Sequence, residues 1–75
     1  MRLSDLQRKD IVNINDGRII GRVIDADINE KDGTLMSLII EKNKYLKNIF
    51  SSESEVTIRF EQIKKLGSDV ILIEI

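Results

Sequence analysis

Residues 16–41 read DGRIIGRVIDADINEKDGTLMSLIIE, and this stretch decides the fold. Asp16-Gly17 and Asp32-Gly33 border two apolar runs, over residues 19–28 and 34–41. Asp-Gly between apolar runs is a strong hairpin signal, because glycine readily adopts the positive φ that a tight turn requires. The spacing therefore predicts two long strands joined by a turn, and we expect the rest of the chain to add strands and caps to this hairpin.

Neither face of the predicted strand over residues 19–28 is consistently apolar. Arg22 interrupts the even-numbered positions, and Asp25 and Asp27 interrupt the odd-numbered ones. A glycine inside a strand often marks a bulge or a bend. We therefore expect the strand to change face near Gly21 or Asp25. A long, sharply bent strand that serves both sides of a small barrel would show this pattern.

The remaining segments are short. Ser4 and Gln7 have the spacing of a capping box, which predicts one helical turn before a strand over residues 11–14. Residues 55–60 and 70–75 have strand patterns, and a single helical turn ending at Gly67 lies between them. Five or six short strands with one or two single-turn helices predict one all-β domain over residues 1–75, a small closed or half-closed β-barrel.

Composition narrows the chemistry. The chain has 75 residues, no Cys and no His, so it has no thiolate metal site, no disulfide and no imidazole base. Twelve basic and 13 acidic residues nearly cancel, which argues against a surface built entirely for nucleic acid. No apolar run approaches the roughly 20 residues of a membrane span. No secretory signal is visible either, so we expect a cytoplasmic protein.

The acidic string over residues 25–32 superficially resembles a calcium loop. Asp25, Asp27 and Asn29 match the first positions, but Glu30 stands where the loop needs Gly, and Met36 stands where it needs a bidentate Glu. The simpler interpretation is exposed strand carboxylates followed by turn residues. The chain also has no Ser-His or Cys-His pair and no Gly-rich phosphate loop. We therefore predict neither a metal, nor a cofactor, nor an enzymatic activity.

Residues 42–50 are the strongest candidate for a contact surface. Lysines are interleaved there with aromatic and aliphatic residues, and the candidate partner-binding residues are Lys42, Lys44, Tyr45, Lys47 and Phe50. Such a segment suits an acidic protein surface, an RNA strand or an anionic membrane surface. Alternatively, its apolar side chains cover one mouth of the barrel while the lysines stay in water. Three lysines are too few for strong binding driven by phosphate contacts alone.

Four segments together resemble the PRC-barrel family, and more narrowly its YlmC/YmxH group of small, sporulation-associated proteins. They are RLSDLQRKDIVNINDGRIIGRVIDADIN (2–29), KDG with TLMSLIIE (31–41), EVTIRFEQIKKLG (55–67) and SDVILIEI (68–75). The resemblance implies a small β-barrel that acts as an interaction or assembly module without known catalysis. Relatives include a domain of the photosynthetic reaction-centre H subunit and a domain of a ribosome maturation factor. The motif residues Asp16, Gly17, Arg18, Gly21 and Asp25 transfer only as structural positions.

Three hypotheses about function follow. The first is a non-enzymatic protein-interaction module associated with sporulation, with an unknown partner and with residues 42–50 as its contact. The second is an RNA- or ribosome-associated module, by analogy with the maturation factor. The third is a homodimer, formed through the strand over residues 34–41 or through the terminal ILIEI strand, because symmetric dimers are a common solution for small domains.

Overall fold

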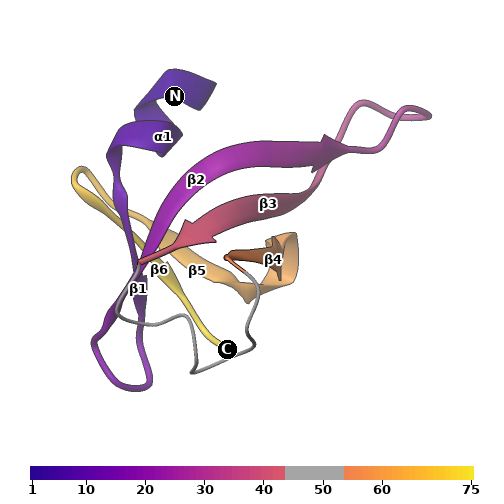
Figure 1. The fold of residues 1–75 in the computed structure, drawn as a ribbon. Helices are drawn as coiled ribbons and strands as arrows, with labels where there is room; N and C mark the ends of the chain where they lie inside the picture. The colour runs from indigo at the N-terminus through magenta and orange to yellow at the C-terminus, as the bar shows by residue number, and fades with distance from the viewer. Residues whose placement is uncertain (44–53) are drawn as a thin grey trace.

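The computed structural model describes residues 1–43 and 54–75, which form one sheet with a short helix at its start (Figure 1). The elements in chain order are α1 (Leu3–Arg8), β1 (Asp10–Asn13), β2 (Ile19–Ile28), β3 (Leu35–Lys42), β4 (Glu55–Arg59), the 3-10 helix η2 (Phe60–Gln62), β5 (Ile63–Leu66) and β6 (Val70–Ile73). The predicted number of strands is therefore confirmed. The helical turn predicted to end at Gly67 is wrong in its extent, because only Phe60–Gln62 form a 3-10 turn and Ile63–Leu66 pair with β6 as β5. No helix in these two ranges is long and apolar enough to span a membrane.

The six strands lie in the order β4-β3-β2-β1-β6-β5. Neighbouring strands are antiparallel, except that β1 and β6 are parallel, with Asp10 opposite Val70 and Asn13 opposite Ile73. The sheet is not closed, since β4 and β5 are its two ends in the described part of the chain. These two strands follow each other through η2, where the Gln62 side chain accepts the Arg59 N–H and the Gln62 carbonyl accepts the Glu74 N–H. The fully closed form of the predicted barrel is therefore wrong, because a 3-10 corner, not a ladder, joins the two ends.

The hairpin predicted over residues 16–41 is confirmed by its turns. Gly17 and Gly33 have φ values of 71° and 75°, the positive values that glycine tolerates best. Asn29 donates its N–H to the Thr34 carbonyl, and Gly33 donates to the Asn29 carbonyl. These bonds close the turn between β2 and β3, which are antiparallel over most of their length.

The predicted change of face in β2 is also confirmed. In the pairing of β2 with β3, the register shifts between Val23 and Asp25. In the pairing of β2 with β1, Gly21 lies opposite Ile11 and Ile19 lies opposite Val12, so the register shifts at the residue between them. As a result, Ile20 and Val23 are both buried although they are three residues apart. A Cβ on Gly21 would lie 1.9 Å from the backbone oxygen of Glu41, so only glycine allows β3 to approach this closely.

The core lies on the inner face of the curved sheet. Most strands contribute to it, and its fully enclosed members are Ile11, Ile20, Val23, Leu38, Ile40, Ile58, Ile71 and Ile73. Leu6 of α1 packs against this cluster, whereas Leu3 is exposed. The predicted cap at Ser4 is wrong, because the N-cap is Arg2, whose N–H donates to the Asp5 carboxylate at 2.8 Å, and the helix therefore begins two residues earlier than expected.

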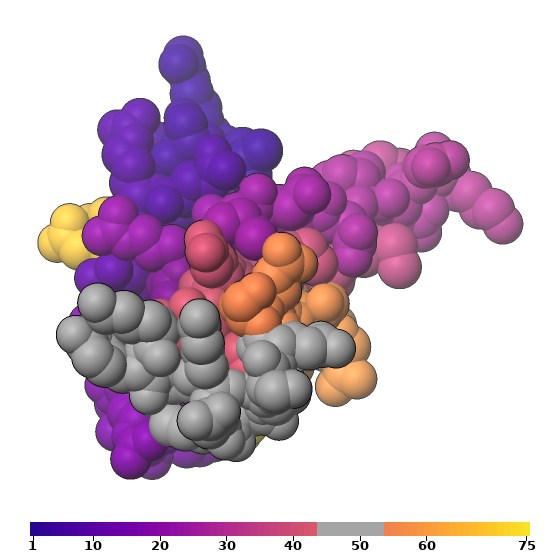
Figure 2. Space-filling view, in the orientation of Figure 1, coloured from indigo at the N-terminus to yellow at the C-terminus, as the bar shows by residue number. Residues whose placement is uncertain are grey.

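The far part of the β2–β3 hairpin, residues 24–36, projects from the rest of the molecule and is called the arm below (Figures 1 and 2). β1 pairs with β2 only at Ile19 and Gly21, so the later part of β2 has β3 on one side and no described strand on the other. By contrast, β3 lies between β2 and β4, and β6 lies between β1 and β5. The two strands that we expected at a dimer contact therefore already have strand neighbours along both edges.

Candidate functional site

Lys42 is the first of the predicted contact residues, and it is the last residue of β3. It is only 4% exposed. Its N–H donates to the Ser54 carbonyl at 2.7 Å, and the next residue, Asn43, donates to the Ile20 carbonyl at 2.7 Å. Lys44, Tyr45, Lys47 and Phe50 lie outside the described residues. The structure therefore places the start of the predicted contact segment at the end of β3, beside Ile20 and Ser54. This place is called the rim of the sheet below.

A hollow of about 280 Å³ lies beside this rim. It is lined mainly by charged side chains from three strands, namely Asp10, Arg22, Glu41 and Lys42, together with Ile19, Gly21 and Asn43. Arg22 contacts Asp10 through Nε and Oδ1 at 3.3 Å, and both side chains are well exposed. An exposed pair of this kind contributes little to stability. Both signs of charge are present, so the hollow suits a polar segment of mixed charge better than a polyanion.

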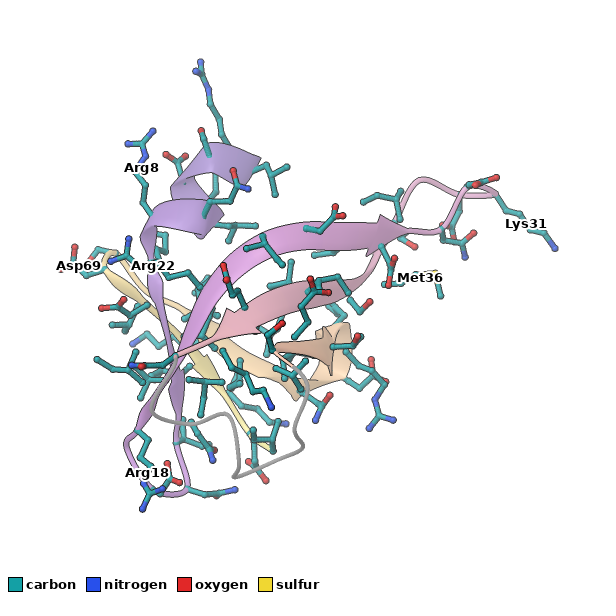
Figure 3. All side chains as sticks on the ribbon, viewed as in Figure 1. Arg8, Arg18, Arg22, Lys31, Met36 and Asp69 are labelled. Atoms are coloured by element: carbon teal, nitrogen blue, oxygen red, sulfur yellow. The ribbon has the colours of Figure 1, made fainter. Side chains whose placement is uncertain are left out.

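A second hollow, about 600 Å³, lies between α1 and the turn from β5 to β6. The Lys9 ammonium group projects beside it and donates to the backbone oxygens of Gly67 and Ser68 at 2.8 and 2.7 Å. These bonds join the N-terminal segment to a turn almost 60 residues away in the chain. The charge of Lys9 is therefore engaged in holding the fold together, although Arg8 and Asp69 remain at the surface around it (Figure 3).

The acidic string of β2 and its turn is bonded within the hairpin. Asp25 accepts the Ala26 N–H at 2.8 Å, and the Ser37 hydroxyl donates to Asp27 at 2.9 Å. Asp32 accepts both the N–H and the hydroxyl of Thr34, and these bonds lower the pKa of its carboxyl. No group of three or more metal-binding side chains occurs within residues 1–43 and 54–75. The observed contacts match the interpretation of this string as strand and turn residues.

Sequence reasoning missed that several large apolar side chains are exposed on the arm, on η2 and on β5. The exposed side chains there are Ile24, Ile28 and Met36 of the arm, Phe60 of η2, and Leu66 of β5. A hollow of about 400 Å³ between Leu35, Met36 and Phe60 also contains Arg59 and Glu61. The sequence contained one signal of this exposure, because Ile28 and Met36 lie on either side of the turn between β2 and β3. Residues next to that turn lie in the arm, beyond the core.

Comparison with known proteins agrees with this architecture. The family model described as PRC-barrel domain matches residues 1–75. The chain is 36% identical over 73 residues to the probable sporulation protein YlmC of Bacillus subtilis strain 168, covering 97% of this chain and 90% of that protein. It is 32% identical over 77 residues to the uncharacterized protein YmxH of the same strain, covering 100% of this chain and 89% of that protein. The resemblance stated from the sequence is thereby confirmed over the whole chain.

Proposed function

Because this chain belongs to the PRC-barrel domain family, we propose that it is a small, non-enzymatic, cytoplasmic module that binds another protein during sporulation. The association with sporulation is supported by the similarity to YlmC, a probable sporulation protein. This similarity extends over nearly all of both chains. The binding role is inferred from the sheet rim described above. Fold alone does not fix function, so the rim carries this part of the proposal.

The observation that carries the proposal is the way the sheet holds both ends of the candidate contact segment. The N–H of Lys42 bonds to the Ser54 carbonyl, and the N–H of Asn43 bonds to the Ile20 carbonyl. Lys42 and Ser54, which flank the candidate segment, are therefore adjacent on the sheet. Contact residues attached to a rigid scaffold lose less conformational entropy on binding than residues of an untethered chain.

The composition of that segment indicates the chemistry of the partner. Lys44 and Lys47 supply positive charge, while Tyr45 and Phe50 supply two of the three aromatic side chains in the whole protein. Aromatic residues are enriched at protein interfaces, where they bury a large area with few rotatable bonds. We propose that the partner presents an acidic surface with an apolar hollow. Lys42 is buried in β3, so its role in this proposal is to position the segment and not to meet the partner.

An affinity-capture experiment tests the contact. The tagged wild-type chain and the Lys44→Ser/Lys47→Ser variant would be used to recover proteins from sporulating cells, followed by mass spectrometry. We expect the variant to lose the specific partner, because these charges provide both the long-range attraction to the partner and the polar contacts at the periphery of the interface. The matched control is Arg18→Ser/Lys31→Ser, which removes two exposed positive charges elsewhere. Equal recovery by all three proteins would contradict the proposed contact.

The same variants separate a protein partner from RNA. If the segment bound RNA, the wild type would retain labelled RNA on a filter at low salt, and retention would fall steeply as salt increases. The proposal instead expects no retention of RNA by the wild type at low salt. If the wild type retained RNA and Lys44→Ser/Lys47→Ser did not, the segment would bind RNA, and the RNA-associated alternative would replace the proposal of a protein partner.

A further inference from the structure

Among the strand edges that have no neighbour in the described residues, those of β2 along the arm and of β5 carry opposite charges. The first is the edge of β2 along the arm, which contains Asp25 and Asp27 and has no strand beside it in the described residues. The Ala26 N–H on this edge donates to the Asp25 carboxylate at 2.8 Å. A side-chain carboxylate thus occupies a backbone donor that a neighbouring strand would otherwise use. Ile28, at the end of the same edge, is 53% exposed.

The second edge belongs to β5, the last strand of the sheet. β5 pairs with β6, and its other side has no strand partner in the part of the chain that the structure describes. Its middle residues, Lys64 and Lys65, are exposed, and Leu66 is 48% exposed. The register against β6 shifts between Ile63 and Lys65, so Lys64 is the bulged residue. The edge of β5 therefore combines positive charge with an exposed leucine.

We propose that copies of this chain assemble head to tail, with the β2 edge of one copy adding to the β5 edge of the next. Strand addition supplies backbone hydrogen bonds to groups that otherwise bond to water or to a side chain. It also places Asp25 and Asp27 beside Lys64 and Lys65, and opposite charges across adjacent strands are stabilising. The exposed Ile28 and Leu66 become covered in the same contact.

The charges select this arrangement over a symmetric one. Pairing two β2 edges would oppose aspartates, and pairing two β5 edges would oppose lysines, both of which are unfavourable. Of the possible pairings between these two edges, only the mixed one joins unlike charges. A contact between two different surfaces of one chain is heterologous, so it generates a ring or an open filament and not a closed dimer.

The shape of the molecule makes the β2 edge accessible. The arm projects beyond the body in both the ribbon and the space-filling view (Figures 1 and 2). Lys31 points outward at its tip, and Met36 lies along its lower side (Figure 3). This surface differs from the rim invoked for the sporulation partner, so the inference goes beyond that proposal.

Sedimentation velocity with purified protein tests the inference. At roughly 100 µM, where mass action favours association, and about 50 mM salt, where exposed charges are weakly screened, the wild type should sediment as species larger than a dimer. Asp25→Lys/Asp27→Lys and Lys64→Glu/Lys65→Glu should each weaken assembly by at least about tenfold, because like charges then meet across the contact. An equimolar mixture of these two variants should assemble again, since each supplies the edge that the other has lost.

Controls separate charge complementarity from loss of fold. Glu30→Lys/Asp69→Lys makes the same change in net charge as the β2 variant but lies off the edge, and it should assemble like the wild type. Asp25→Asn/Asp27→Asn keeps the hydrogen-bond acceptors and should weaken assembly without changing the circular dichroism spectrum. A monomeric wild type, a closed dimer, or a mixture of the reversed variants that stays monomeric while both are folded would each overturn the inference. These measurements use the chain alone, so they succeed or fail independently of the affinity capture.

Discussion

At the scale of single residues, close backbone approach and short hydrogen bonds explain positions that composition does not. Gly21 lies where β1, β2 and β3 meet, and a Cβ there would overlap the backbone of Glu41. Asp5 and Asp32 each accept backbone N–H groups within a few residues of themselves. These side chains belong to local structure, and each has a consequence that can be measured.

Gly21→Ala should destabilise the domain strongly. The added methyl group would lie 1.9 Å from the Glu41 oxygen, and that oxygen belongs to the backbone, so β2 and β3 must separate. Overpacking of this kind costs about 1–3 kcal/mol or more. Urea denaturation measures the change in the free energy of unfolding. Arg22→Ala, an exposed change in the same strand, should leave the midpoint nearly unchanged, and equal midpoints for the two variants would contradict the close approach.

Asp32 should titrate below its ordinary value of 3.8, because the backbone and the hydroxyl of Thr34 donate to its charged form and lower its pKa. A depressed pKa stabilises the folded state above the unfolded pKa, and this contribution is lost as the pH falls through the folded pKa. NMR titration of the Asp32 carboxyl measures the shift. Thr34→Val removes the hydroxyl donor and should raise the pKa towards 3.8. An unchanged pKa in that variant would show that the hydroxyl has no part in the shift.

At the scale of elements, side-chain contacts between residues far apart in the chain stabilise segments that would not be stable alone. α1 is six residues long, too short to be stable alone. It is tied down by Leu6 on the core and by the neighbouring Lys9, whose ammonium group bonds to the turn between β5 and β6. The arm is the opposite case, since it extends past the core and is held by pairing between β2 and β3.

Lys9→Met should loosen the junction between the N-terminal segment and the β5–β6 turn. The variant keeps the apolar length of the side chain but removes the donor to the Gly67 and Ser68 carbonyls. Because this turn is only partly buried, water can replace part of the lost bonding, and the cost should be about 1 kcal/mol. Thermal denaturation and amide exchange in residues 67–69 measure the effect. Lys31→Met, at the exposed tip of the arm, is the control. If both variants melt together with the wild type, Lys9 does not clamp the turn.

At the scale of the whole molecule, eight buried aliphatic side chains from one curved sheet form a single core. A domain of this size has only roughly 4–11 kcal/mol of stability by the usual value per residue. Each core residue therefore contributes a large share of the total. A single core also implies that the described strands unfold together as one cooperative unit.

Ile58→Ala should remove much of the stability of the molecule. Ile58 is completely buried, and truncating such a residue costs about 2–5 kcal/mol because a cavity remains. In a domain this small each kcal/mol shifts the melting temperature by about 4–8 °C, so calorimetry should show a fall well above 8 °C. Ile14→Ala changes a partly exposed isoleucine and serves as the control. Comparable falls in the two variants would contradict a single core centred on Ile58.

The sequence by itself determined the local structure of this protein. Asp-Gly turns at residues 16–17 and 32–33, the bend of β2 and the short strands all depend on the conformational preferences of neighbouring residues. The PRC-barrel resemblance also came from the order and spacing of local motifs. By contrast, the parallel pairing of β1 with β6 joins residues about 60 positions apart, and the open ends at β4 and β5 depend on the path of the complete chain.

The same division applies to the candidate site. The concentration of lysine and aromatic residues over residues 42–50 was visible in the sequence, but the burial of Lys42 was not, because it results from strands brought together by the fold. The capping role of Asp5 and the clamp at Lys9 were missed for related reasons. Above all, the sequence contained Asp25, Asp27, Lys64 and Lys65 without indicating which of their strands had free edges. Only the tertiary structure decided that, because an edge exists only after every other strand has found its neighbour.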